Sequence, residues 1–152
     1  MPKPRYYWDS GVFIAVLKNE KRDDPSDLPG ALEVLDLADN GEAFIITSGI
    51  TFTEVLDRPG DAPVRERFRR VFERPNYKTV VPVLPITDKA ADLRQQFGLK
   101  LPDATHLATA LLTKVDEMHT FDGDDLIPLS GRPELGGLII RKPGATQKRL
   151  PL

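Results

Sequence analysis

Four acidic side chains lie where a carboxylate could act on a bound ligand. Asp9 and Asp122 each end a run of residues that is typical of a strand, whereas Glu54 and Asp103 each lie near the start of a predicted helix. In open α/β sheets, ligands bind at the carboxyl ends of the strands. We therefore expect the four acids to reach the same edge of a sheet.

Carboxylates that converge without basic partners repel one another, which raises their pKa values and destabilises the fold. A hard divalent cation relieves this repulsion, and Mg²⁺ or Mn²⁺ suits a site with a few carboxylates and several waters. Such a site can activate a water and stabilise charge on a phosphodiester. The chemistry that follows is hydrolysis of nucleic acid.

Each acid also has a purely structural interpretation. The spacing of Thr51 and Glu54 fits a capping box, which favours a structural role for Glu54 taken alone. Asp103 suits the positive end of a helix dipole. Asp9 and Asp122 stand next to turn-forming residues. The chemical interpretation rests on the order and placement of all four acids together.

Strand-like and helical segments alternate along most of the chain. The predicted strands are residues 5–8, 43–47, 79–84, 118–121 and 138–140. The predicted helices are residues 12–17, 31–38 and 64–72, a short helix around Glu54, residues 87–97 with Thr87 as the cap and Gly98 as the end, and the helix that carries Asp103. This alternation predicts an α/β sandwich, with a mostly parallel central sheet and helices on both faces.

The helix that carries Asp103 has the clearest signals. Pro102 suits its first turn, where the missing N–H costs nothing. Its apolar stripe consists of Ala104, Leu107, Ala108 and Leu111. Because two of these are alanines, we expect another element to approach this helix closely. His106 follows Asp103 by one turn. We favour the interpretation of His106 as a helix residue with satisfied hydrogen bonds over its interpretation as a metal ligand, since an oxygen site for a hard metal needs no imidazole.

The length and composition are those of one globular domain. The chain has 152 residues, of which 40% are hydrophobic and 29% charged, which suits a single domain over residues 1–140 and a basic tail over residues 141–152. The net charge of −2 gives no overall attraction to nucleic acid, so binding must come from a local patch. The chain has no cysteine for a thiolate metal site, and no run approaches the ~20 apolar residues of a membrane span. We expect a cytoplasmic protein.

Two groups of basic residues are candidates for such a patch. The first group is Arg65, Arg67, Arg69 and Arg70, in the predicted helix 64–72. The second group is Arg141, Lys142, Lys148 and Arg149, in the predicted tail. A solvated surface is the favoured interpretation of both groups, and contact with RNA phosphates, for which we name Arg65, Arg69 and Arg70, is the alternative.

Four segments of the chain resemble the PIN-domain family, close to the VapC-type toxins of bacterial and archaeal toxin–antitoxin pairs. They are residues 7–14 (YWDSGVFI), 51–56 (TFTEVL), 101–110 (LPDATHLATA) and 120–122 (TFD). The segment around Asp103 is the most specific of the four. The resemblance extends from about residue 5 to about residue 127.

This resemblance implies a Rossmann-like α/β/α fold, an acidic pocket that binds Mg²⁺ or Mn²⁺, and metal-dependent endoribonuclease activity. The residues that match the catalytic acids of the family are Asp9, Glu54, Asp103 and Asp122. Of these, Asp9, Asp103 and Asp122 are the expected metal ligands. A further acid often follows the last one, and Asp124 is the nearer match, with Asp125 as the alternative. Thr120 matches a residue that supports the last acid.

The chain departs from the family pattern at one place. Two residues after the first aspartate the family usually has a small hydroxyl or amide residue, and this chain has Gly11. Ser10 beside it, or a water, would then supply the polar contact. The resemblance also implies a homodimer and, for a toxin, an antitoxin protein that blocks it.

The leading hypothesis is an endoribonuclease that depends on Mg²⁺ or Mn²⁺ and acts as the toxin of a toxin–antitoxin pair. One alternative is a PIN nuclease of RNA processing. Another is a non-catalytic RNA-binding or assembly module that keeps the acids for its fold. A phosphohydrolase of small esters is disfavoured, because neither a Gly-rich phosphate loop nor an Asp-x-Asp pair follows the first strand.

Overall fold

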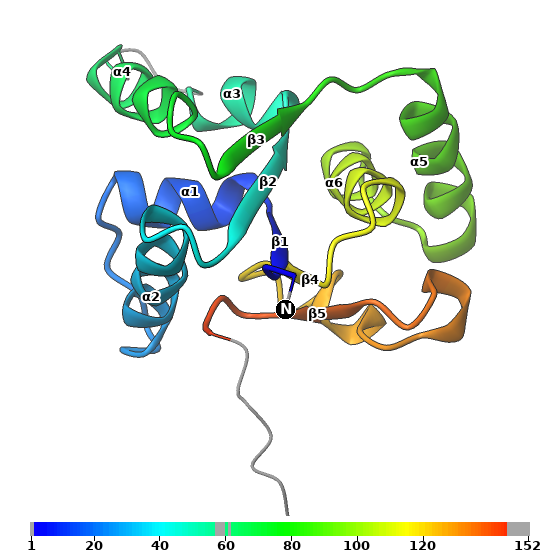
Figure 1. Ribbon diagram of the computed structural model, residues 1–152. Helices are drawn as coiled ribbons and strands as arrows, with labels where there is room; N and C mark the ends of the chain where they lie inside the picture. The colour runs from blue at the N-terminus through cyan, green and yellow to red at the C-terminus, as the bar shows by residue number, and fades with distance from the viewer. Residues whose placement is uncertain (1, 57–59, 61, 146–152) are drawn as a thin grey trace, which may run out of the picture.

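The computed structural model describes residues 2–56, 60 and 62–145 (Figure 1). The strands are β1 (Arg5–Trp8), β2 (Phe44–Ser48), β3 (Tyr77–Val80), β4 (Glu117–His119) and β5 (Ile139–Arg141). The helices are α1 (Ser10–Leu17), α2 (Asp27–Asp39), α3 (Ile50–Val55), α4 (Ala62–Val71), α5 (Leu84–Phe97) and α6 (Leu101–Leu112). Two short 3₁₀ turns, η1 (Ile127–Leu129) and η2 (Pro133–Leu135), connect β4 to β5.

The strands form one parallel sheet in the order β3-β2-β1-β4-β5. The chain begins in the middle of this sheet, builds outward from β1 to β3, and then crosses to β4 on the other side of β1. The strand order therefore reverses between β1 and β4, which is where open α/β sheets bind their ligands. Pairing of Trp8 with His119 makes the segments that follow β1 and β4 emerge side by side.

Successive residues of β1 face opposite layers of the molecule, as the pleat of a strand requires. Tyr7 packs into a core with α5 and α6, whereas Tyr6 and Trp8 pack into a core with α1, α2 and α4. Figure 1 shows these two groups of helices on opposite faces of the sheet. The α/β sandwich predicted from the alternation of strands and helices is confirmed.

The alanines of α6 allow it to lie close to the sheet. Ala104 and Ala108 are fully buried in one apolar cluster with Ile46 of β2 and Leu93 of α5. The close approach predicted from the sequence is therefore confirmed. This packing fixes the first turn of α6, which carries Asp103, relative to β2.

The predicted strand over residues 79–84 is wrong in its position. The structure ends β3 at Val80 and begins α5 at Leu84, with Val83 as the N-cap. Pro82 cannot donate to a sheet ladder, and the proline within the first turn of α5 suits a helix start. Thr87 is consequently inside the helix, where its hydroxyl donates to the carbonyl of Leu84, and the predicted cap is wrong.

Other boundaries move by a few residues. The first two helices begin earlier than predicted, at residues 10 and 27 rather than 12 and 31, and β4 ends at residue 119 rather than 121. Arg141, taken as the first residue of the tail, is the last residue of β5. The next residue, Lys142, pairs with Asp24 at 3.2 Å and Asp27 at 2.9 Å, so the folded part continues past residue 140. Lys148 and Arg149 lie outside the described residues.

Within the described ranges, no helix combines the length and the apolar character that crossing a bilayer requires.

Candidate functional site

Asp9 stands at the carboxyl end of β1 and caps the helix that follows. Its Oδ1 accepts a hydrogen bond from the backbone N–H of Val12 at 3.2 Å, and its Oδ2 accepts one from the Thr120 hydroxyl at 2.5 Å. Only 7% of Asp9 is exposed. Burial raises the pKa of Asp9, and the charge of His106 and these two hydrogen bonds oppose that rise.

Thr120 and Asp122 shape the loop that leaves β4. The Thr120 hydroxyl oxygen accepts a hydrogen bond from the backbone N–H of Asp122 at 3.0 Å. Oδ1 of Asp122 in turn accepts from the backbone N–H groups of Asp124 at 3.0 Å and Asp125 at 2.9 Å. These bonds fix a tight acidic turn beside Asp9 and leave the other oxygen of Asp122, Oδ2, for a ligand. The supporting role predicted for Thr120 therefore has a geometric basis at both acids.

Asp103, in the first turn of α6, faces this acidic turn. Carboxylate oxygens of Asp103, Asp122 and Asp125 all lie within 4.8 Å of one another. Burial, followed by the charges of Asp122 and Asp9, raises the pKa of Asp103 to about 6. Three converging carboxylate oxygens are the donor set that Mg²⁺ or Mn²⁺ prefers, and a cation there would relieve the repulsion.

The geometry replaces Asp124 by Asp125 in the candidate ligand set. The carboxylate of Asp125 belongs to the cluster, and that of Asp124 does not. Both residues donate a backbone N–H to Asp122 and both side chains are exposed, so the position of the carboxylate alone distinguishes them. Sequence spacing favoured Asp124, because the direction of a side chain within a turn cannot be read from its distance along the chain.

Glu54 reaches the site from α3, and its capping-box interpretation is wrong. The helix begins at Ile50, with Gly49 as the N-cap and no side-chain cap, so Thr51 lies inside it and its hydroxyl bonds Thr47 at 2.7 Å. Oε1 of Glu54 lies 2.6 Å from Nε2 of His106. The charge of Glu54 acts to raise the pKa of Asp9, after larger contributions from burial, His106 and the two hydrogen bonds.

His106, which the sequence analysis favoured as an ordinary helix residue, lies beside Glu54 in the structure. The residue is 1% exposed, and its ring has partners at both nitrogens, with the Tyr7 hydroxyl at 2.7 Å from Nδ1. The prediction that its hydrogen bonds are satisfied is confirmed. The available signal was its spacing of three residues from Asp103, which puts both side chains on one face of α6.

Ser10 and Gly11 open helix α1 directly after Asp9. Ser10 is mostly buried. A Cβ on Gly11 would lie 3.5 Å from Oδ1 of Asp9, which is ordinary contact. A larger residue would therefore fit at position 11. Gly11 leaves this side of Asp9 without the polar side chain that the family usually has there.

The arginines named for RNA contact lie on the exposed side of α4. Arg65, Arg69 and Arg70 are all exposed, and Arg70 pairs with Glu66 at 3.4 Å. The opposite side of the same helix buries Phe68 in the core. Figure 1 shows α4 next to α3, the helix that carries Glu54.

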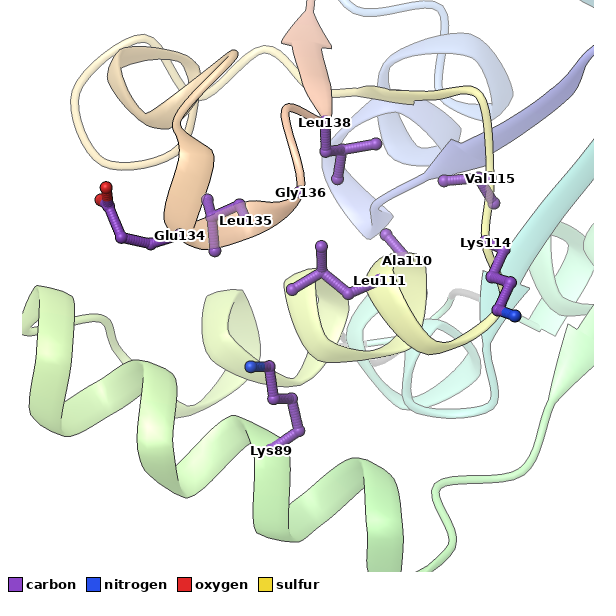
Figure 2. Close-up of a pocket in the computed structure, with 9 residues that line it drawn as sticks. All are labelled: Lys89, Ala110, Leu111, Lys114, Val115, Glu134, Leu135, Gly136 and Leu138. Atoms are coloured by element: carbon purple, nitrogen blue, oxygen red, sulfur yellow. The ribbon is translucent and has the colours of Figure 1, made fainter.

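A cavity of about 320 Å³ lies between α5, α6 and η2, away from the acids (Figure 2). It is lined by Leu111, Val115 and Leu135, with Lys89 and Lys114 at its edge. The residues of α6 that line it follow Asp103 by two turns, or ~10 Å along the helix axis. The cavity belongs to the other end of α6 and takes no part in the candidate site.

The fold and the acidic cluster together define a Rossmann-like α/β domain with a carboxylate site at the switch between β1 and β4. The family model of the PIN domain matches residues 6–127. The chain therefore belongs to the PIN-domain family. No curated protein matches its sequence.

Several solved structures share the fold. The toxin–antitoxin complex from Klebsiella pneumoniae is 25% identical, with a TM-score of 0.63 over 88% of this chain and 95% of that one. VapC20 of Mycobacterium tuberculosis, a toxin that cleaves the sarcin–ricin loop, is 15% identical, with a TM-score of 0.59 over 78% and 91%. VapBC2 from Rickettsia felis, bound to a DNA fragment from its promoter, is 14% identical, with a TM-score of 0.61 over 90% and 96%.

Proposed function

We propose that this protein is a metal-dependent endoribonuclease that hydrolyses RNA phosphodiesters. The observation that carries the proposal is the convergence of the Asp103, Asp122 and Asp125 carboxylates within 4.8 Å, beside the buried Asp9, at the switch point of the sheet. Burial, followed by the charges of Asp122 and Asp9, raises the pKa of Asp103 to about 6. A fold tolerates such a cluster when the acids serve a bound cation.

The residues that would hold the cation are Asp103, Asp122 and Asp125, with Asp9 completing the acidic wall. Their donors are all carboxylate oxygens, which fits Mg²⁺ or Mn²⁺ and does not fit soft metals. Such a cation supplies electrophilic stabilisation of a phosphodiester and lowers the pKa of an attacking water.

The chain itself positions these groups. Thr120 and the N-terminus of α1 hold Asp9, and the backbone of residues 124 and 125 holds Asp122. Glu54 comes from α3, and its Oε1 is engaged by His106. We assign its Oε2 to the attacking water, whose proton it would accept as a general base.

We further propose that the protein acts as the toxin of a toxin–antitoxin pair, in the cytoplasm, with an antitoxin protein as its partner. The support is its structural similarity to the toxin–antitoxin complex of K. pneumoniae and to VapBC2 of R. felis. Induced expression should arrest growth, and co-expression of the short gene beside its own should restore it. The Asp103→Asn variant should not arrest growth. Harmless expression of the wild type would favour a PIN nuclease of RNA processing.

A homodimer is also part of this proposal. Three apolar side chains next to the edge strand β3 are exposed, Val81 to 71%, Val83 to 49% and Leu84 to 78%, and clusters of this kind mark association surfaces. Light scattering should show a dimer, and the pair Val81→Asp and Leu84→Asp should give a monomer. Leu32→Asp, on the exposed face of α2, is the matched control. A wild-type monomer would contradict the assignment.

A panel of substrates tests the nuclease function. Purified protein should cleave unstructured and hairpin RNAs internally with Mn²⁺ or Mg²⁺, and EDTA should stop the reaction. The alternatives give different results: a small-ester phosphatase would turn over a chromogenic phosphate ester and leave RNA intact. A non-catalytic module would bind RNA and cleave nothing.

A further inference from the structure

A chain of hydrogen bonds runs from the interior of the sheet to Glu54. The backbone N–H of Ser48, at the end of β2, donates to the Tyr7 hydroxyl oxygen at 3.1 Å. The Tyr7 oxygen lies 2.7 Å from Nδ1 of His106, and Nε2 of His106 lies 2.6 Å from Oε1 of Glu54. These hydrogen bonds connect β2, β1, α6 and α3. They end at Glu54, the catalytic candidate on the short helix α3.

The direction of the last bond follows from its partners. An ionised carboxylate only accepts hydrogen bonds, so Nε2 of His106 carries the proton and donates it to Glu54. The Tyr7 hydroxyl keeps its proton, because burial raises its pKa far above neutrality, and it can donate to Nδ1. Tyr7, a residue of β1, is fully buried in the core that contains α6, so its hydroxyl has a fixed position and orients the imidazole.

We propose that His106 is a positioning residue, which holds the Glu54 carboxylate in the site through Nε2–H while Tyr7 fixes the His106 ring. The inference rests on the proposed nuclease function and adds a residue outside the acidic set.

Electrostatics explains why Glu54 needs such a partner. The negative charges of Glu54 and Asp9 repel one another. Glu54 also lies on a helix of only six residues, and its side chain has several rotatable bonds. Repulsion and side-chain entropy would both move the carboxylate away from the other acids. A charge-assisted hydrogen bond of 2.6 Å opposes both effects.

A purely structural role predicts something different. The other residues of this part of α6 are buried alanine, leucine and threonine, and leucine could fill the same volume as His106. Imidazole adds a donor aimed at Glu54 and an acceptor aimed at Tyr7. Loss of the donor should therefore affect the reaction while the fold stays intact.

Two substitutions at His106 form the matched pair for the test. The side-chain amide of Gln can place its nitrogen where Nε2 lies, whereas Asn is shorter and places its nitrogen near Nδ1. We expect His106→Asn to lower kcat for RNA cleavage by about 10- to 100-fold, with KM for RNA nearly unchanged, as for other residues that orient a catalytic group. His106→Gln should restore most of kcat, and Tyr7→Phe should lower kcat in the same direction by less.

A double-variant cycle with Glu54→Ala separates positioning from packing. Once Glu54 is absent, His106→Asn should cost no further activity. Additive losses in the double variant would overturn the proposal, and so would equal kcat values for the Asn and Gln variants. If the wild type cleaves RNA and His106→Asn cleaves it equally well, only this inference fails. If the wild type does not cleave RNA, the proposed function fails and takes this inference with it.

NMR of the ring protons supplies a readout that does not depend on turnover. The chain has only two histidines, so ¹⁵N-histidine labelling gives two rings, and the His106→Gln variant assigns them. The Nε2–H proton of His106 should be protected from exchange in the wild type, and Glu54→Ala should remove this protection. A signal that Glu54→Ala leaves unchanged would show that the bond does not hold Glu54, and would overturn the proposal.

Discussion

The Thr120 hydroxyl donates a hydrogen bond to Oδ2 of Asp9 across 2.5 Å, although the two residues are 111 positions apart in the chain. The same hydroxyl accepts a hydrogen bond from the backbone N–H of Asp122. One side chain therefore sets the positions of two acids, at the point where the strand order of the sheet reverses. The acidic site depends on this contact between the ends of β1 and β4.

Replacement of Thr120 by Val tests this contact. Val keeps the shape of Thr and removes the hydroxyl, which leaves the buried Asp9 with one hydrogen bond fewer. We expect a loss of about 1–3 kcal/mol in the free energy of unfolding, measured in urea, because a buried charged acceptor loses its donor. RNA cleavage should fall by about 10- to 100-fold. Thr120→Ser keeps the hydroxyl and should keep most of the activity, and equal effects of Val and Ser would contradict this role.

The raised pKa of Asp103 predicts how the metal-free protein responds to pH. The folded protein binds this proton more tightly than the unfolded chain, with a pKa of about 6 against an ordinary value of 3.8. The contribution of this proton to stability is complete below about pH 4 and is lost as the pH rises through 6. The free energy of unfolding of the metal-free protein should therefore fall between pH 4 and pH 6. Because Asp103 is only partly buried, solvent screening leaves an effect of about 1 kcal/mol.

Asp103→Asn removes the titrating carboxyl group and, with it, the repulsion between Asp103 and the charges of Asp122 and Asp9. In EDTA at pH 7.5 the variant should melt a few degrees above the wild type. Mn²⁺ should raise the melting temperature of the wild type by mass action and that of the variant much less. A variant that melts below the wild type in EDTA would show that the Asp103 charge stabilises the fold, contrary to this account.

The choice between Asp125 and Asp124 gives a matched pair of exposed acids in the same turn. Asp125→Asn should reduce the gain in melting temperature with Mn²⁺, because its carboxylate belongs to the cluster with Asp103. Asp124→Asn should leave that gain unchanged, since its carboxylate lies outside the cluster. If Asp124→Asn has the larger effect, the turn rearranges when the cation binds.

The arginines of α4 are tested by the salt dependence of RNA binding. Replacing Arg65, Arg69 and Arg70 by Gln should reduce the slope of log K against log salt by ~0.7 for each RNA phosphate that the helix no longer neutralises. Catalytically inactive Asp103→Asn protein is the suitable background. Lys89→Gln with Lys114→Gln, beside the cavity of Figure 2, is the control and should leave the slope unchanged. An unchanged slope for the arginine variant would identify α4 as a solvated face.

The sequence predicted the layers and the location of the site because both depend on local signals. Apolar runs and helical periodicity predicted the strands and helices, and the rule for parallel sheets then predicted that acids following β1 and β4 would meet. The position of β3 could not be predicted from β-branched residues alone. There, Pro82 ends the ladder and the proline in the first turn of α5 begins the helix.

The side-chain pairs of the site depend on contacts that no local pattern contains. Glu54 and His106 are 52 residues apart, and each had an adequate local explanation, as a cap residue and as a satisfied helix residue. The capping box failed because the helix begins one residue before Thr51. Asp124 and Asp125 both follow Asp122 closely, and only the folded turn decides which carboxylate joins Asp103.

Cleavage of a labelled RNA by the wild type and by Asp103→Asn, at equal concentrations of folded protein and over a titration of Mn²⁺, tests the central claim most directly. The account predicts internal cleavage by the wild type that rises with Mn²⁺ and stops in EDTA. It predicts that Asp103→Asn, although folded and at least as stable without metal, cleaves at least about 100-fold more slowly. Cleavage by Asp103→Asn at the wild-type rate, or cleavage by the wild type that persists in EDTA, would contradict it.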